Sequence, residues 1–99
     1  ASGRRTRMWS QEGQQDLRDI RAFISQDNPN AAKNVVTRIV TLVRDQLTAN
    51  PETGRTGRVA GTRELVIANT PFIVPYRIRD KYIDILRVYH AARMWPEQF

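Results

Sequence analysis

Arginines and a single histidine are the residues in this chain that could do chemistry. The 99 residues hold 16 Lys and Arg against 10 Asp and Glu, so the formal net charge is +6. Arg63, Arg77 and Arg87 lie on three successive predicted strands, and His90 and Arg93 follow the last one. Arg55 and Arg58 lie in the approach to the first of these strands. Guanidinium groups bind carboxylates and phosphates through paired hydrogen bonds, so we expect these side chains to gather on one face and attract an anionic partner.

Most other kinds of catalytic site are excluded by composition and spacing. The chain has no cysteine, which removes thiolate nucleophiles, disulfides and cysteine-bound zinc. A single histidine rules out multi-histidine metal sites, and Gly54, Gly57 and Gly61 lack the spacing of a phosphate-binding loop. A metal-free RNA cleavage, with a base, an acid and cations for the phosphate, stays possible. We therefore expect no metal and no cofactor.

Plainer interpretations stand beside this one. Arg77 can instead be a solvated cross-strand partner of Asp84, since a two-residue turn at Asp80–Lys81 places them opposite each other. His90 is more often an ordinary half-buried histidine than a catalyst. Tyr89 and Trp95 are expected to cover the sheet edge rather than stack on bases.

Two helices must position these residues. Ser10 is a predicted N-cap, and the first helix runs to about Asp27 with one apolar side. Its periodicity places Asp16 among the polar residues of the opposite side. Asn28 and Pro29 form a cap-and-start signal for a second, longer helix that ends at Asn50. So short a connection predicts an antiparallel helical hairpin.

The pattern then changes to that of strands. We predict strands over residues 5–9, 62–68, 72–79 and 82–89, with a turn or frayed helix over residues 90–99. Pro75 predicts a bulge or an unbonded edge within its strand. The fold class is therefore α+β, with a helical hairpin packed on a small twisted antiparallel sheet in the order β-α-α-β-β-β.

The length indicates a single domain over residues 1–99. Residues 1–4 are expected to be a disordered tail or a cloning remnant. No apolar run approaches the length that spans a bilayer, and no signal-peptide pattern follows the basic start, so we expect a cytoplasmic protein with no membrane partner.

Several segments in this order resemble the RelE/ParE superfamily, the toxins of type II toxin–antitoxin pairs. They are Trp9–Ser10, Asp16–Leu17 with Ile20, residues 27–29 (DNP), residues 58–65 (RVAGTREL), residues 76–78 (YRI) and residues 85–93 (ILRVYHAAR). The resemblance implies a helical hairpin on a sheet and a cognate antitoxin that wraps the toxin as a hetero-oligomer. It allows two targets, because RelE-like members cleave mRNA on the ribosome and ParE-like members poison DNA gyrase.

The sequence favours the ParE-like branch. Ile73 stands where the RelE-type pattern has an arginine, and the strand after Arg63 carries no lysine. Loss of a cation at a phosphate site weakens transition-state stabilisation. The Tyr89–His90 pair, in contrast, resembles the end of YoeB-like ribonucleases.

The leading hypothesis is a toxin that inhibits DNA gyrase and hence replication, without being an enzyme, and that a ParD-like antitoxin neutralises. The expected target contacts are Arg87, His90, Arg93 and Trp95. The expected antitoxin contacts are Arg58, Arg63, Arg77 and Arg87. The alternative is a ribosome-dependent mRNA endoribonuclease whose catalytic residues are Arg77, Arg87, His90 and Arg93. A third possibility is a module whose only activity is antitoxin binding.

Overall fold

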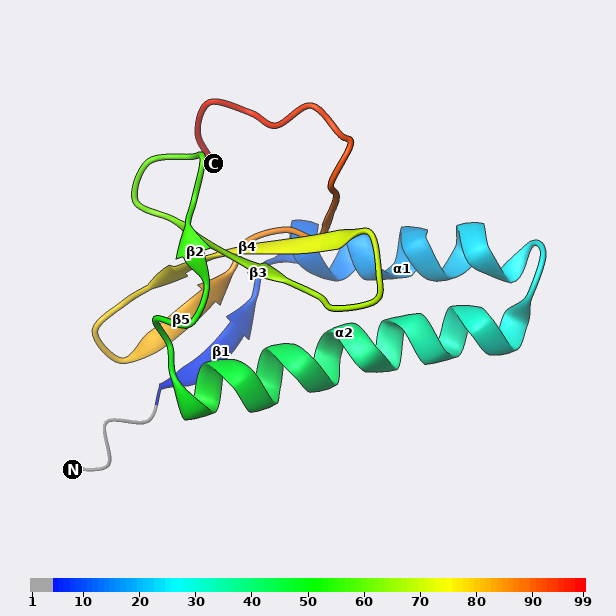
Figure 1. The fold of residues 1–99 in the computed structure, drawn as a ribbon, viewed down its shortest axis with the longest axis horizontal. Helices are drawn as coiled ribbons and strands as arrows, with labels where there is room; N and C mark the ends of the chain where they lie inside the picture. The colour runs from blue at the N-terminus through cyan, green and yellow to red at the C-terminus, as the bar shows by residue number, and fades with distance from the viewer. Residues whose placement is uncertain (1–4) are drawn as a thin grey trace.

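The computed structural model describes residues 5–99, and the prediction for residues 1–4 lies outside them. Its secondary structure consists of β1 (Thr6–Trp9), α1 (Gln11–Ser25), α2 (Pro29–Ala49), β2 (Arg55–Thr56), β3 (Arg63–Val66), β4 (Phe72–Ile78), β5 (Tyr82–Ile85) and β6 (Tyr89–His90). Figure 1 shows the two helices side by side along the length of the molecule. The predicted order is confirmed, with β2 and β6 as short additions.

The helices begin where the sequence predicts. The Ser10 hydroxyl accepts the Gly13 N–H at 2.9 Å, and the Asn28 side chain accepts the Ala31 N–H at 3.0 Å. Each bond satisfies one of the amides that an α-helix leaves unpaired in its first turn. Pro29 occupies the first turn of α2, where a missing N–H costs nothing.

The sheet is mixed rather than antiparallel throughout. Its strand order is β1-β5-β4-β3-β2, and β6 pairs with β4 beyond the end of β5. β3, β4 and β5 pair antiparallel, as predicted, and the added β2 pairs antiparallel with β3, but β1 runs parallel to β5. The helical hairpin and three strands separate β1 from β5 along the chain, so no tight turn imposes an antiparallel pairing on them.

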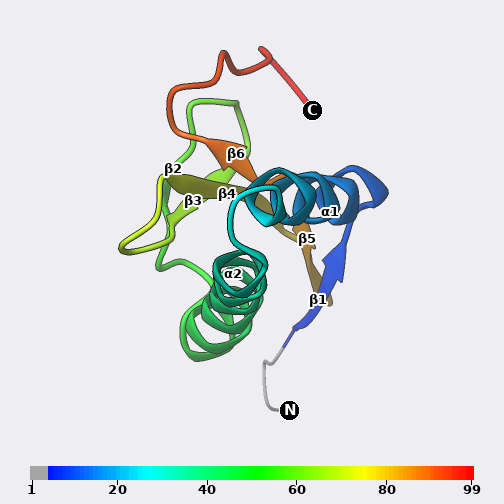
Figure 2. The same ribbon diagram turned by 90° about the vertical axis from the view of Figure 1, so that its right-hand side faces the viewer.

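The core lies between the helical hairpin and one face of the sheet. Ile39, Val43 and Leu47 of α2 pack with Val74 and Tyr76 of β4, all of them almost fully buried. Figure 2 shows α2 on one side of the sheet and the C-terminal segment on the other. We call the side turned away from the helices the helix-free face.

A bulge interrupts the predicted strand over residues 82–89. β5 pairs with β4 through Ile85 and Tyr76, and β6 pairs with β4 through Tyr89 and Ile73. Between these pairs, two residues of β4 lie opposite three residues of the other segment. Side chains alternate between faces, so one extra residue reverses everything that follows it. Tyr89 therefore lies on the helix-free face, and His90 lies on the helix side.

Three side chains account for this bulge. Pro75 has no N–H to give, and the Leu86 carbonyl opposite it accepts the Ser10 hydroxyl at 2.6 Å instead. The Leu86 N–H still donates to the Pro75 carbonyl at 3.0 Å. The Val88 N–H then turns away from the sheet and donates to the Asp16 carboxylate at 2.9 Å. The irregularity predicted at Pro75 is confirmed.

Candidate functional site

Five side chains form what we call the arginine–aromatic cluster on the helix-free face: Arg58, Arg87, Tyr89, Arg93 and Trp95. The guanidinium carbons of Arg87 and Arg93 lie 4.8 and 4.4 Å from the centre of the Tyr89 ring. Trp95 meets Tyr89 edge to face at 5.0 Å, and the Arg58 guanidinium lies 3.9 Å from the Trp95 ring centre. Cation–π contacts of this kind are strongest when they are partly desolvated.

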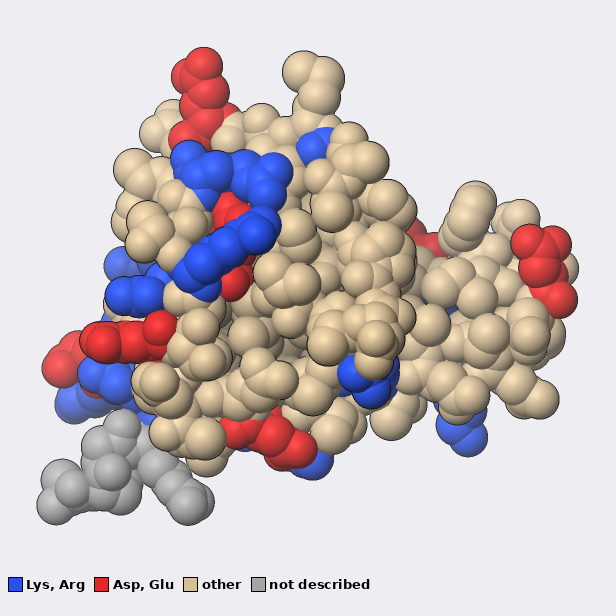
Figure 3. All heavy atoms as spheres, in the orientation of Figure 1, with Lys and Arg blue, Asp and Glu red and all other residues tan. Residues whose placement is uncertain are grey.

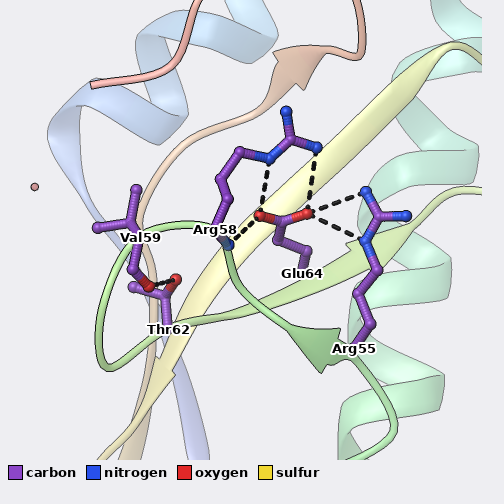
Figure 4. A network of polar contacts seen from close by, with 5 residues as sticks. All are labelled: Arg55, Arg58, Val59, Thr62 and Glu64. Carbon is purple, nitrogen blue, oxygen red and sulfur yellow. Dashed lines mark hydrogen bonds and ion pairs between the residues drawn. The ribbon is translucent and has the colours of Figure 1, made fainter. Parts of the chain in front are cut away.

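Glu64 anchors one end of this cluster (Figure 4). Its Oε1 accepts Arg55 Nη2 at 2.9 Å and Arg55 Nε at 3.1 Å. Its Oε2 accepts the Arg58 backbone N–H at 2.8 Å and Arg58 Nε at 3.1 Å. The Glu64 side chain is only 1% exposed, whereas those of Arg55 and Arg58 are 52% and 42% exposed. A buried carboxylate thus holds two cations at the surface.

The ionised form of Glu64 is favoured on balance. Burial alone raises the pKa of its carboxyl, but the hydrogen bonds from Arg58 and Arg55 outweigh burial and hold that pKa below its ordinary value of 4.5. Glu64 therefore stays charged at neutral pH and keeps both arginines in place.

Asp16 anchors the other end. Its carboxylate accepts Arg87 Nε at 2.8 Å and Arg87 Nη2 at 3.0 Å, in addition to the Val88 N–H. The side-chain hydrogen bond to Asp16 raises the pKa of Arg87, which burial alone would lower. The helical periodicity placed Asp16 on the polar, outward side of the first helix. That prediction is wrong, because the carboxylate is buried against the bulge.

Two of the predicted arginines lie apart from this cluster. The Arg63 guanidinium donates to the backbone carbonyls of Glu52 and Gly54, beyond the end of α2, and Arg63 pairs with the core residue Tyr76 on the helix side. Arg77 is on the helix-free face beside the Gly61 turn. Between residues 5 and 99, no hydrogen bond, ion pair or cation–π contact joins it to the cluster. The expectation of one patch holds for Arg58, Arg87 and Arg93. It is wrong for Arg63, and Arg77 shares the face but lies apart from the cluster.

The ion pair predicted between Arg77 and Asp84 is replaced by one between Arg79 and Asp84. Arg77 does lie opposite Asp84, as the two-residue turn requires. The Asp84 carboxylate, however, accepts Arg79 Nε at 2.8 Å. Arg79 follows the end of β4, where its long side chain can fold back over the turn.

His90 lies on the helix side, away from the arginine–aromatic cluster. Its ring meets Phe72 edge to face at 5.9 Å, and its Nδ1 accepts the Ala92 N–H at 3.1 Å. It borders a mainly apolar groove of about 490 Å³ towards the end of the helical hairpin where α1 and α2 are connected, with Ile20 and Phe23 of α1. The expected convergence of His90 with Arg77, Arg87 and Arg93 is therefore wrong, and the bulge is the reason.

Residues 91–99 contain no helix. The Ala91 N–H donates to the Pro71 carbonyl at 2.8 Å, and the chain then crosses the helix-free face so that Trp95 and Phe99 approach Tyr89. Tyr89 is 2% exposed beneath them. Beside this segment, an open hollow of about 590 Å³ is lined by Arg87, Arg93 and Trp95 among others.

The surface charge is distributed unevenly between the sheet and the helical hairpin. In Figure 3, Lys and Arg atoms gather over the part of the molecule that carries β2, with acidic atoms among them. The far end of the helical hairpin shows few charges in that view. Among residues 5–99, no group of His, Asp and Glu is placed to hold a metal ion, and no helix is long and apolar enough to span a bilayer.

Sequence reasoning missed Asp16 and Glu64 as parts of the site. Arg63 and Glu64 are adjacent in β3 and face opposite sides of the sheet, so Glu64 has no partner in the neighbouring Arg63. The available signal was a carboxylate directly before the apolar run Leu65–Ile67, because a carboxylate that is buried with such a run requires cationic or N–H donors.

Comparison with known proteins identifies the family to which the chain belongs. The family model described as the ParE toxin of the type II toxin–antitoxin system parDE matches residues 8–95. The chain belongs to the ParE toxin family. Among its relatives, Y4kP of Sinorhizobium fredii is 46% identical over 90% of this chain and 91% of its own length. Toxin RelE2 of Caulobacter vibrioides is 37% identical over 88% of this chain and 96% of its own length.

Solved structures show the same fold. A chain of the chromosomal ParDE toxin–antitoxin system from P. aeruginosa matches with a TM-score of 0.78 at 30% identity, covering 91% of this chain and 98% of that one. A chain of the RelBE2 toxin–antitoxin complex from Mycobacterium tuberculosis matches with a TM-score of 0.64 at 21% identity, covering 88% of this chain and 98% of that one. This ParE-family chain is thus a toxin of a type II toxin–antitoxin system with the RelE/ParE fold.

Proposed function

We propose that this ParE-family toxin acts by binding DNA gyrase and blocking replication, rather than by cleaving RNA. The observation that carries the proposal is the bulge between β5 and β6. It puts His90 on the helix side of the sheet and Tyr89, with its two stacked arginines, on the helix-free face. A single reacting phosphate cannot touch both a base and stabilising cations that are separated in this way.

The target contact would lie on the helix-free face. Among the arginines of the arginine–aromatic cluster, Arg93 is the one that no carboxylate of the described residues engages, and Trp95 is only partly buried. Arg87 contributes mainly by holding the Tyr89 ring, since Asp16 occupies two of its nitrogens. The bulge removes His90 from this surface. Arginine and tryptophan are the side chains most often responsible for binding energy at protein interfaces.

A ParD-like antitoxin would neutralise the toxin in a hetero-oligomer, in the cytoplasm where gyrase acts. The similar solved chains come from toxin–antitoxin systems, which supports such a partner. Arg58 and Arg77 are the proposed contacts on the helix-free face, with Arg87 at its edge and Arg63 on the helix side. An antitoxin that covers all four must pass around the edge of the sheet. Its affinity should fall as salt rises, though less than for a purely ionic surface.

Two assays on the purified toxin test the target. We expect it to inhibit DNA supercoiling by gyrase and to trap cleaved DNA, and to leave ribosome-bound mRNA intact. Cutting of that mRNA would instead support the ribonuclease alternative, which the relationship to a toxin named RelE2 favours. No effect in either assay, with tight antitoxin binding, would reduce the chain to a binding module.

A further inference from the structure

We infer that Arg55 and Arg58, held by the buried Glu64, form a receptor for a side-chain carboxylate of a partner protein. This inference rests on the proposed antitoxin contact at Arg58. It adds Arg55 as a second contact, Glu64 as a positioning residue and the chemical group that is recognised.

Glu64 engages only some of the N–H donors of Arg55 and Arg58. Each guanidinium gives Glu64 its Nε and Nη2 groups, and in the described part of the chain the Nη1 group of each donates to no acceptor. One carboxylate neutralises one of the two positive charges. The remaining charge and the outer N–H groups lie on side chains that are about half exposed. The site therefore has both the charge and the donors to take a second carboxylate.

The guanidinium of Arg58 is also fixed in orientation. Glu64 holds its edge, and the Trp95 ring lies 3.9 Å from its carbon. The Arg58 backbone N–H donates to the same carboxylate, so the loop that carries the side chain is tied down as well. A side chain already held in its binding geometry loses little conformational entropy when a partner arrives.

The surroundings favour a protein over a nucleic acid. Val66, on the same face of β3, is 49% exposed, and Trp95 is half-buried beside Arg58. Arginine next to exposed apolar and aromatic side chains is typical of protein interfaces. A phosphate backbone requires a run of cations without internal partners. On this face, Arg79 is paired with Asp84 and Arg87 with Asp16, whereas Arg77 and Arg93 have no carboxylate partner among the described residues. Paired and unpaired cations are thus mixed, and they do not form the run of free cations that a phosphate backbone requires. The ligand is thus an acidic segment with an apolar side chain next to its carboxylate.

An NMR titration reads the site directly. The probe is a short synthetic peptide of Glu, Asp and Leu, and its counterpart contains Gln and Asn in place of the acids. We expect the acidic peptide to shift the side-chain N–H signals of Arg55 and Arg58 in a saturable way and the amide peptide to leave them unchanged. The signal of Arg44, an exposed arginine paired with Asp45 on α2, is the internal control.

Conservative variants separate geometry from charge. Arg55→Lys and Arg58→Lys keep the positive charge but lose the planar guanidinium, so each should lower the affinity for the acidic peptide about tenfold. Arg44→Lys should change that affinity less than about twofold. Glu64→Gln makes the site more positive. A positioning role predicts weaker binding in that variant, and simple electrostatics predicts tighter binding. Unfolding curves of each variant check that it folds.

Three results would overturn the inference: no saturable shift with the acidic peptide, Arg58→Lys binding as tightly as the wild type, or a single-stranded oligonucleotide shifting the same signals at lower concentration. All three are binding measurements on the isolated protein. A toxin that fails to inhibit gyrase can therefore still pass this test, and one that inhibits gyrase can fail it.

Discussion

Asp16 and Glu64 are both buried carboxylates that bind arginine, yet their surroundings differ. Asp16 receives one guanidinium, that of Arg87, whose side chain is 25% exposed, and a backbone N–H. Glu64 receives two guanidiniums whose side chains are about half exposed. Charge is balanced at Asp16, and a positive charge is left over at Glu64. The first centre therefore ties distant parts of the fold together, and the second leaves cations exposed at the surface, as the proposed carboxylate receptor requires.

The difference also concerns which backbone each carboxylate holds. Asp16 joins α1 to the bulge between β5 and β6, far away along the chain. Glu64 holds the short segment after β2, within a few residues of its own strand. Loss of Asp16 should therefore affect the whole molecule, and loss of Glu64 mainly a surface.

The largest expected effect is that of Asp16→Ala. It leaves the Arg87 guanidinium and the Val88 N–H partly buried without an acceptor, which should cost about 3 kcal/mol of unfolding free energy. Urea unfolding measures the loss, and the near-ultraviolet circular dichroism of Tyr89 and Trp95 should weaken with it. A loss below about 1 kcal/mol would mean that the bulge does not depend on Asp16.

Glu64→Gln should cost less, about 1 to 2 kcal/mol at neutral pH, because water can solvate the two exposed arginines. The pKa of Glu64 is lowered in the folded protein, so its contribution is present above the ordinary value of 4.5 and is lost as pH falls through the folded value. The stability difference between wild type and variant should shrink as the pH of the urea titrations is lowered past that range. A constant difference would argue against ion pairing at Glu64.

Ser10→Ala tests the bulge from its other side. The hydroxyl both caps α1 and donates to the Leu86 carbonyl that Pro75 cannot serve. We expect a loss of about 1 kcal/mol, at the level of an ordinary helix cap plus one hydrogen bond. Hydrogen exchange of the amides in the first turn of α1 and of Val88 should accelerate together. If exchange became faster in the helix alone, the Ser10 hydroxyl would cap α1 without stabilising the bulge.

The smallest effect should come from Arg44→Gln. Arg44 and Asp45 form an exposed pair on α2, with both side chains 58% exposed. Such pairs contribute little, so the change should stay within about 0.5 kcal/mol. A thermal or urea midpoint that moves more than this would show that charge in general, and not burial, sets the stability differences above.

Local signals in the sequence predicted most of the fold. Ser10, Asn28 and Pro29 fix where the helices begin, and alternation fixes the faces of β3 and β4. Pro75 even marked the irregular point of the sheet. These features depend on neighbours in the chain or on the covalent structure of one residue, so they can be read without coordinates.

The site was harder to predict, because its contacts join distant segments. Asp16 and Arg87 are 71 residues apart in sequence. One extra residue in the bulge reversed the faces of Tyr89 and His90, and alternation alone cannot anticipate an insertion of this kind. The sequence thus predicted which residue types matter and misplaced His90 and Arg63.

The central claim is that the helix-free face acts on the target and that His90 does not. Titration of gyrase supercoiling with purified variants tests it most directly. Arg93→Gln combined with Trp95→Ala should raise the inhibitory concentration at least about tenfold, as expected for hot-spot side chains, while His90→Ala should inhibit like the wild type. Loss of inhibition in His90→Ala, with the Arg93 and Trp95 variant unaffected, would contradict the account.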